Sequence, residues 1–204
     1  MKQLGNLFTI LSLFCGFFSI IFSLEGFFMQ AAYAIILSFV LDGLDGQIAR
    51  SNNCASEFGK ELDSLVDVVC FGVAPVVLGE VMLGQIRILS LAVFFFYLSC
   101  AVIRLAKYNI CTKDSRTLYF NGLPTTVSAG MLASFVLISE LKSAFLVIVF
   151  LLSLLMVSSV KYPNIDGLLR IFGFRIKMLL LVAVFFLVLS VYFYKEGVFI
   201  FIIF

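Results

Sequence analysis

The chain has 204 residues, of which 63% are hydrophobic and only 13% are charged, and its formal net charge is +2. This composition excludes an ordinary water-soluble domain, because soluble proteins carry far more charged and polar residues. Histidine is absent, which also excludes imidazole bases, Ser-His-Asp triads and zinc sites built on imidazole. Any catalytic base must therefore be a carboxylate, a lysine, a cysteine or a tyrosine.

Apolar runs of about the length that crosses a bilayer predict an all-α, polytopic membrane protein. We expect a single domain over residues 1–204, built as a bundle of about 7–8 transmembrane helices. In chain order the expected spans are Leu4–Ser23, Phe27–Arg50, Leu62–Leu83, Ile86–Lys107, Pro124–Ser139, Ser143–Val160 and Ile176–Tyr194. The last apolar piece, Val198–Phe204, is too short to cross alone and is either truncated or part of a tilted eighth span. The first run is too long for a cleaved signal peptide.

The basic residues indicate an orientation. With Met1 in the cytoplasm and alternating spans, only Arg87, Lys142 and Lys195 of the 14 Lys and Arg residues fall outside. Because cytoplasmic loops carry the excess of positive charge, we expect a multi-pass protein of the plasma membrane with a polar cavity facing the cytoplasm. The segment Lys161–Lys177 either lies along the interface against anionic membrane lipids or is a plain cytoplasmic loop.

Four aspartates interrupt this apolar sequence in two pairs. Asp42 and Asp45 are three residues apart at the end of the second span, and Asp63 and Asp67 are four residues apart in the third. On helices each spacing puts both carboxylates on one face. Acids that face one another in an apolar chain cannot all stay charged without cations. Carboxylate oxygens suit Mg²⁺ or Mn²⁺, so the pattern predicts two divalent ions and phosphate chemistry.

Small residues and one cation accompany these aspartates. Gly43, Gly46, Ala49 and Gly59 leave space for a ligand or a second helix to approach the backbone. Arg50 lies one turn beyond Gly46, where a guanidinium can bind a phosphate through two N–H groups. Metal ligands, a phosphate-binding arginine and free space together predict a nucleotide-diphosphate site.

The segment from Asp42 to Asp67 resembles the signature of the CDP-alcohol phosphotransferase family. The fixed positions of that signature are all filled, by Asp42, Asp45, Gly46, Ala49, Arg50, Gly59, Asp63 and Asp67. The resemblance implies that the four aspartates hold the divalent ions, and that Asp67 is also the general base.

The resemblance also implies contacts with a CDP-activated lipid. Gly46 and Arg50 would touch the cytidine nucleotide and its phosphates, and Ser56 in the following loop is a further candidate for a phosphate contact. Asn6 and Thr9 form an N-x-x-T pattern similar to an element beside the nucleotide in this family. The alternative for these two residues is that they cap a helix near the interface.

Two later segments look like segments of the integral-membrane phosphatidylserine synthases. The first is Arg104–Asn109, and the second is Tyr119–Thr126, in which Thr126 replaces a proline of the usual pattern. The second segment also contains Pro124, which suits the first turn of a helix whatever else the segment does.

These segments imply L-serine as the acceptor alcohol. Arg104 or Lys107 would bind the serine carboxylate, and Asn109, Asn121 or Thr125 would hold its other polar groups. The alternative for Arg104 is a basic anchor that extends to the membrane surface.

The resemblance therefore implies an enzyme that transfers the lipid phosphoryl group of CDP-diacylglycerol or CDP-archaeol to L-serine and releases CMP. Within the family, glycerol 3-phosphate or inositol phosphate is the alternative acceptor. A divalent-cation transporter is a rival from another class, but no acids continue across the spans. A membrane scaffold leaves the motif unexplained. The resemblance further implies a homodimer, and we expect no nucleic-acid partner.

Overall fold

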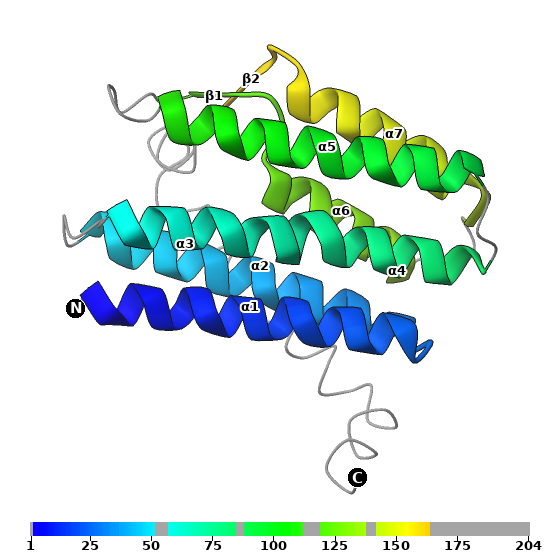
Figure 1. The fold of residues 1–204 in the computed structure, drawn as a ribbon, viewed down its shortest axis with the longest axis horizontal. Coiled ribbons are helices and arrows are strands. Elements are labelled where there is room, and N and C mark those ends of the chain that lie inside the picture. The colour runs from blue at the N-terminus through cyan, green and yellow to red at the C-terminus, as the bar shows by residue number, and fades with distance from the viewer. Residues whose placement is uncertain (1, 52–56, 85–87, 112–118, 138–141, 164–204) are drawn as a thin grey trace, which may run out of the picture. The chain divides into compact units, whose positions relative to one another are not determined.

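The structure is a computed structural model that describes residues 2–51, 57–84, 88–111, 119–137 and 142–163 (Figure 1). The chain divides into two compact units, one of Met1–Arg116 with Asn121–Lys161 and the other of Thr117–Phe120 with Tyr162–Phe204. The predicted spans Ile176–Tyr194 and Val198–Phe204 lie outside the described residues, so the single-domain prediction stays a prediction.

Within the described ranges, helices are found at each predicted apolar run. They are α1 (Lys2–Leu24), α2 (Phe28–Ser51), α3 (Glu57–Asp67), the π-helix η1 (Val68–Val73), α4 (Ala74–Leu83), α5 (Ile88–Cys111), α6 (Thr125–Leu137) and α7 (Lys142–Val157). The elements α3, η1 and α4 follow one another without a break and form one long helix. Two three-residue strands, β1 (Tyr119–Asn121) and β2 (Lys161–Pro163), pair in a short ribbon. The helical fold class is confirmed, with this ribbon as a small addition.

The described helices differ in how well they match the thickness of a bilayer. Three segments, Gly5–Leu24, Glu57–Leu83 and Ile88–Ile110, are long and apolar enough to cross. The described part of α2, Phe28–Leu44, is a shorter apolar helix, and it already contains Asp42. Large apolar side chains such as Phe14 on α1 are exposed, as expected for surfaces that contact lipid. These features indicate a membrane protein.

Small residues bring α1 close to the two elements that lead to the aspartates. The Ser12 hydroxyl lies 2.7 Å from the Ser38 hydroxyl of α2, and both residues are buried. On the same helix, a Cβ added to Gly16 would collide with Cys70 of η1. Close helix approach through small residues is typical of membrane bundles. Helix α1 therefore packs against both α2 and η1 and helps to fix their spacing.

The π-helix η1 begins directly after Asp67, where the apolar run predicts a regular helix. Pro75 is the physical reason for the difference, because its ring has no N–H and disrupts the regular helical hydrogen bonds before it. The Ala74 N–H donates to the carbonyl oxygen of Val69, five residues back. That spacing defines a π-helical turn, and such turns are frequent at functional sites.

The non-helical segment before α6 is held by the C-terminal end of α7. The Gly122 N–H donates to the Val160 carbonyl at 2.9 Å. Gly122 has a φ of 81°, and a Cβ there would collide with the Met156 carbonyl oxygen. Both observations require glycine. Helix α6 then begins at Thr125, immediately after the proline, which agrees with the helix-start role predicted for that residue.

We expect Gly122→Ala to destabilise the protein, because alanine strains this backbone by about 1–3 kcal/mol and also overlaps α7. The measurement is the melting temperature of the purified protein in detergent. Gly130→Ala is the matched control, since Gly130 lies inside α6 and a Cβ there meets no described atom within 4 Å. The control should melt at the same or a higher temperature. Equal melting of the two variants would contradict the structural role of Gly122.

Candidate active site

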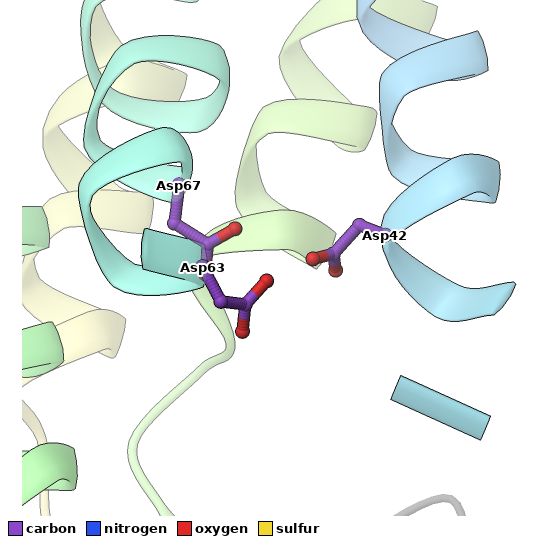
Figure 2. A group of neighbouring side chains, drawn as sticks. All are labelled: Asp42, Asp63 and Asp67. Carbon is purple, nitrogen blue, oxygen red and sulfur yellow. The ribbon is translucent and has the colours of Figure 1, made fainter. Parts of the chain in front are cut away.

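Three of the four predicted metal ligands converge between α2 and α3. Figure 2 shows Asp42 projecting from α2 toward Asp63 and Asp67 on α3. One carboxylate oxygen from each residue lies within 4.8 Å of the other two. Asp45 is one turn further along α2, and its side chain lies outside the described part of the structure. The predicted pairing on one helix face is therefore confirmed for Asp63 and Asp67.

One of the three carboxyl groups is buried and the other two are partly buried. Asp67 is only 9% exposed, and two unit charges 4.8 Å apart repel by about 3 kcal/mol at the effective dielectric of a protein site. The Oδ1 atom of Asp63 is buried with no hydrogen-bond partner among the described residues. Such an oxygen fits a cation, and an all-carboxylate donor set suits Mg²⁺ or Mn²⁺.

Asn6 and Thr9 both lie inside α1 rather than at its end. Because the helix begins at Lys2, the capping alternative for these two residues is wrong. The Thr9 side chain is buried, and its hydroxyl donates to the Gly5 carbonyl one turn earlier at 3.1 Å. Helix α1 packs against α3, the helix that carries Asp63 and Asp67.

The other predicted nucleotide contacts are described only in part. Gly46 and Arg50 belong to the last turns of α2, but the structure does not describe their side-chain surroundings, and Ser56 lies outside the described residues. Gly43 is described, and a Cβ there would meet no atom of the described residues within 4 Å. Among these residues, the glycine leaves space one residue from Asp42.

Arg104 and Thr125, both predicted to contact the acceptor, lie against each other. Nη1 of Arg104 on α5 donates to the Thr125 hydroxyl at the start of α6, at 3.2 Å. The Nε atom of Arg104 is buried and has no hydrogen-bond partner within the described ranges. Asp67 is close enough to interact electrostatically with this guanidinium. The guanidinium is therefore directed into the bundle, which disfavours the surface-anchor alternative.

Asn109, a third predicted acceptor contact, is bonded to α3. Its Nδ2 atom donates to the Ser64 hydroxyl at 2.9 Å, and its backbone carbonyl oxygen accepts a hydrogen bond from Lys60 Nζ at 3.3 Å. These contacts join the end of α5 to the helix of Asp63. Lys60 and Ser64 were not predicted as site residues, although their spacing of four residues places them on one face of α3. The Asn121 side chain lies outside the described part of the structure.

Neutralising one acid tests the repulsion in this cluster. We expect Asp63→Asn to raise the melting temperature in EDTA, because it removes the repulsion of about 3 kcal/mol with each neighbouring carboxylate. The same variant should gain less stability than wild type from added Mn²⁺, since a ligand of the folded state stabilises that state. Thermal unfolding in detergent, with EDTA and with Mn²⁺, measures both effects.

Glu61→Gln on the exposed side of α3 is the matched control for this substitution. It removes one negative charge from the same helix but should change neither melting temperature. If wild type and Asp63→Asn respond equally to Mn²⁺, a cation site at these carboxylates is refuted.

Comparison with known proteins places this site in a family. The family model described as CDP-alcohol phosphatidyltransferase matches residues 2–160. The CDP-diacylglycerol–serine O-phosphatidyltransferase of Helicobacter pylori is 35% identical, with 88% of this chain and 78% of that protein covered. The archaetidylserine synthase of Methanothermobacter thermautotrophicus is 36% identical, with 81% and 71% covered. The chain, with three aspartates of the expected motif gathered between two helices, belongs to the CDP-alcohol phosphatidyltransferase family.

Proposed function

We propose that this protein transfers the phosphatidyl or archaetidyl group of a CDP-activated lipid to the hydroxyl group of L-serine and releases CMP. The observation that carries the proposal is the convergence of Asp42, Asp63 and Asp67 within 4.8 Å, in a chain of this family. The names of its relatives, which include serine transferases for both lipid types, support serine as the acceptor.

We assign four aspartates to two divalent ions, Mg²⁺ or Mn²⁺. Asp42, Asp63 and Asp67 would hold them, together with Asp45 from the following turn of α2. The buried Asp63 oxygen without a hydrogen-bond donor among the described residues supports this assignment. When bound, the ions offset negative charge on the diphosphate and on the leaving CMP.

The CDP-lipid is assigned to the residues around this cluster. Gly46 and Arg50 follow Asp42 on α2, and an arginine there can bind a phosphate through two N–H groups. Ser56 is a further phosphate contact in the proposal. Asn6 and Thr9 on α1 would contact the nucleotide, which is supported by the packing of α1 against both α2 and α3.

Asp67 is the proposed general base. It accepts the proton of the serine hydroxyl while the serine oxygen forms a bond to the lipid-bearing phosphorus and the bond from that phosphorus to CMP breaks. Donor and acceptor are bound together, so no covalent enzyme intermediate is needed. The low exposure of Asp67, 9%, supports the role because it limits competing proton exchange with water.

Arg104 is the proposed ligand of the serine carboxylate. Its Nε–H has no acceptor among the described residues, and its Nη1 is already oriented by Thr125. Serine brings one carboxylate, which one guanidinium can bind. Asn121 and Thr125 would contribute further polar contacts, and Asn109 would act beside them through its bond to Ser64.

The proposed location of the enzyme is a membrane. We place it in the plasma membrane as a homodimer, each protomer a bundle of about 7–8 spans with its cavity open to the cytoplasm. The excess of Lys and Arg on the loops assigned to the cytoplasm supports this orientation.

The acceptor is tested by measuring CMP release from CDP-diacylglycerol in detergent with Mn²⁺. We expect turnover with L-serine and little with glycerol 3-phosphate or inositol phosphate. Arg104→Gln should raise the KM for serine by roughly tenfold or more, the loss of one charge-assisted hydrogen bond, and should change the KM for the CDP-lipid much less.

Lys107→Gln, on the same helix, is the companion variant for this assay. If Lys107 rather than Arg104 binds the carboxylate, the effect on the serine KM will move to Lys107→Gln. Turnover with a phosphorylated alcohol instead of serine would overturn the acceptor assignment and leave the family chemistry intact.

Removal of the base is tested separately. Asp67→Asn should lower kcat by roughly a hundredfold or more, because asparagine cannot accept the serine proton. Binding of the CDP-lipid, measured by equilibrium titration of the purified variant, should be retained. Turnover near the wild-type rate would exclude Asp67 as the base.

A further inference from the structure

A buried tyrosine on α5 is hydrogen-bonded to the backbone just beyond Asp67. The Tyr97 hydroxyl donates to the Phe71 carbonyl oxygen of η1 at 3.0 Å. Phe71 is four residues after Asp67, so the carbonyl belongs to the turn that follows the proposed base. Tyr97 and Phe71 are both fully buried, and a buried tyrosine hydroxyl normally finds a partner of this kind.

The amino-acid sequence explains why this carbonyl accepts a side chain. In a regular α-helix the Phe71 carbonyl would accept the N–H of residue 75. Residue 75 is proline, which has no N–H. The Tyr97 hydroxyl therefore supplies a donor to an oxygen whose usual helical donor does not exist. In a membrane-spanning helix each backbone group needs a partner within the protein, and the Tyr97 hydroxyl is one such partner for this carbonyl.

A third residue continues this network. The Ser128 hydroxyl on α6 lies 3.4 Å from the Tyr97 hydroxyl and donates to it, and Ser128 is also fully buried. Tyr97 precedes Arg104 by seven residues on α5, and Ser128 follows Thr125 by three on α6, spacings that keep each pair on one helix face. The contact between α5 and α6 thus contains two hydrogen-bonded pairs, Arg104 with Thr125 and Tyr97 with Ser128.

These two pairs approach the long helix at successive turns. Arg104 interacts electrostatically with Asp67, and Tyr97 is bonded to Phe71 one turn later. Helix η1 packs against both α5 and α6. The turn that directly follows Asp67 is therefore held from outside its own helix, at the position where proline removes one of the helix's own N–H donors.

We infer that Tyr97 is a positioning residue: its hydroxyl holds the π-helical turn after Asp67 and so orients that carboxylate toward the acceptor. Ser128 supports it by fixing the direction of the tyrosine hydroxyl. The inference rests on the proposed role of Asp67 as the base. It adds Tyr97, which lies outside the family motif, as a residue that orients this base.

The test is Tyr97→Phe in the full-length protein, assayed in detergent with CDP-diacylglycerol, L-serine and Mn²⁺. We expect kcat to fall by roughly tenfold, the scale of effect that a misplaced catalytic group produces. The KM for serine and the KM for the CDP-lipid should stay near their wild-type values. Hydrogen–deuterium exchange of the purified protein should rise at Val68–Val73 and remain unchanged in α1 and α7.

Two further variants distinguish positioning from general stability. Ser99→Ala removes another α5 hydroxyl, which donates to the Phe95 carbonyl of its own helix, and it should leave kcat and η1 exchange unchanged. In a Pro75→Ala background an N–H is again available to the Phe71 carbonyl. Tyr97→Phe should therefore lower kcat less in that background, a coupling that a double-mutant cycle measures.

The kinetic, thermal and exchange measurements separate a positioning role of Tyr97 from a purely stabilising one. A normal kcat for Tyr97→Phe, or a lower melting temperature with unchanged kcat per folded protein, would show that Tyr97 only stabilises the bundle. Equal losses in both backgrounds would refute the link to Pro75. If wild type itself fails to use serine, the proposed function is at fault, and the exchange measurement still tests the contact between Tyr97 and η1.

Discussion

The mutual repulsion of Asp42, Asp63 and Asp67 is the constraint on which the rest of the described structure depends. At about 3 kcal/mol for each pair, this repulsion is comparable with a large part of the net stability of a domain, about 5–15 kcal/mol. Packing elsewhere must hold α2 and α3 together against it. Helix α1 provides such packing, because Ser12 and Gly16 let it approach both α2 and η1 closely. The small residues of α1 are thus linked physically to the acids, although they are distant in sequence.

A second constraint comes from the backbone. Inside a bilayer each N–H and C=O group needs a partner within the protein, so departures from regular helix must be compensated locally. Two such places are found among the residues that the structure describes. At Gly122 the irregular segment before α6 bonds to the end of α7, and at Phe71 the carbonyl affected by Pro75 receives the Tyr97 hydroxyl. Both irregular segments lie close in sequence to proposed site residues, Thr125 in one case and Asp67 in the other. Regular helix is therefore interrupted near proposed site residues. At each interruption, a hydrogen bond from another part of the bundle pairs a backbone group.

The amino-acid sequence predicted the described helices well, because the length of an apolar run is a local property that directly reflects the bilayer. It also predicted that Asp63 and Asp67 share a face, which follows from helical spacing alone. The π-helix was missed, although Pro75 marked the place where regular hydrogen bonding must fail. The bonds of Asn109 to Ser64 and of Tyr97 to Phe71 could not be predicted, because each joins helices whose relative rotation is set by tertiary packing. The capping alternative for Asn6 was wrong because helix α1 extends past it to Lys2.

The residue proposed to bind the acceptor and the residue proposed to orient the base both lie in the contact between α5 and α6. Arg104 and Tyr97 occupy one face of α5, and their partners Thr125 and Ser128 occupy one face of α6. A shift of α6 that altered the Arg104 guanidinium would also alter the hydroxyl bonded to η1, since both pairs lie in the same contact. The arginine proposed to hold the acceptor carboxylate and the tyrosine bonded to the turn after Asp67 are therefore held by one and the same helix contact.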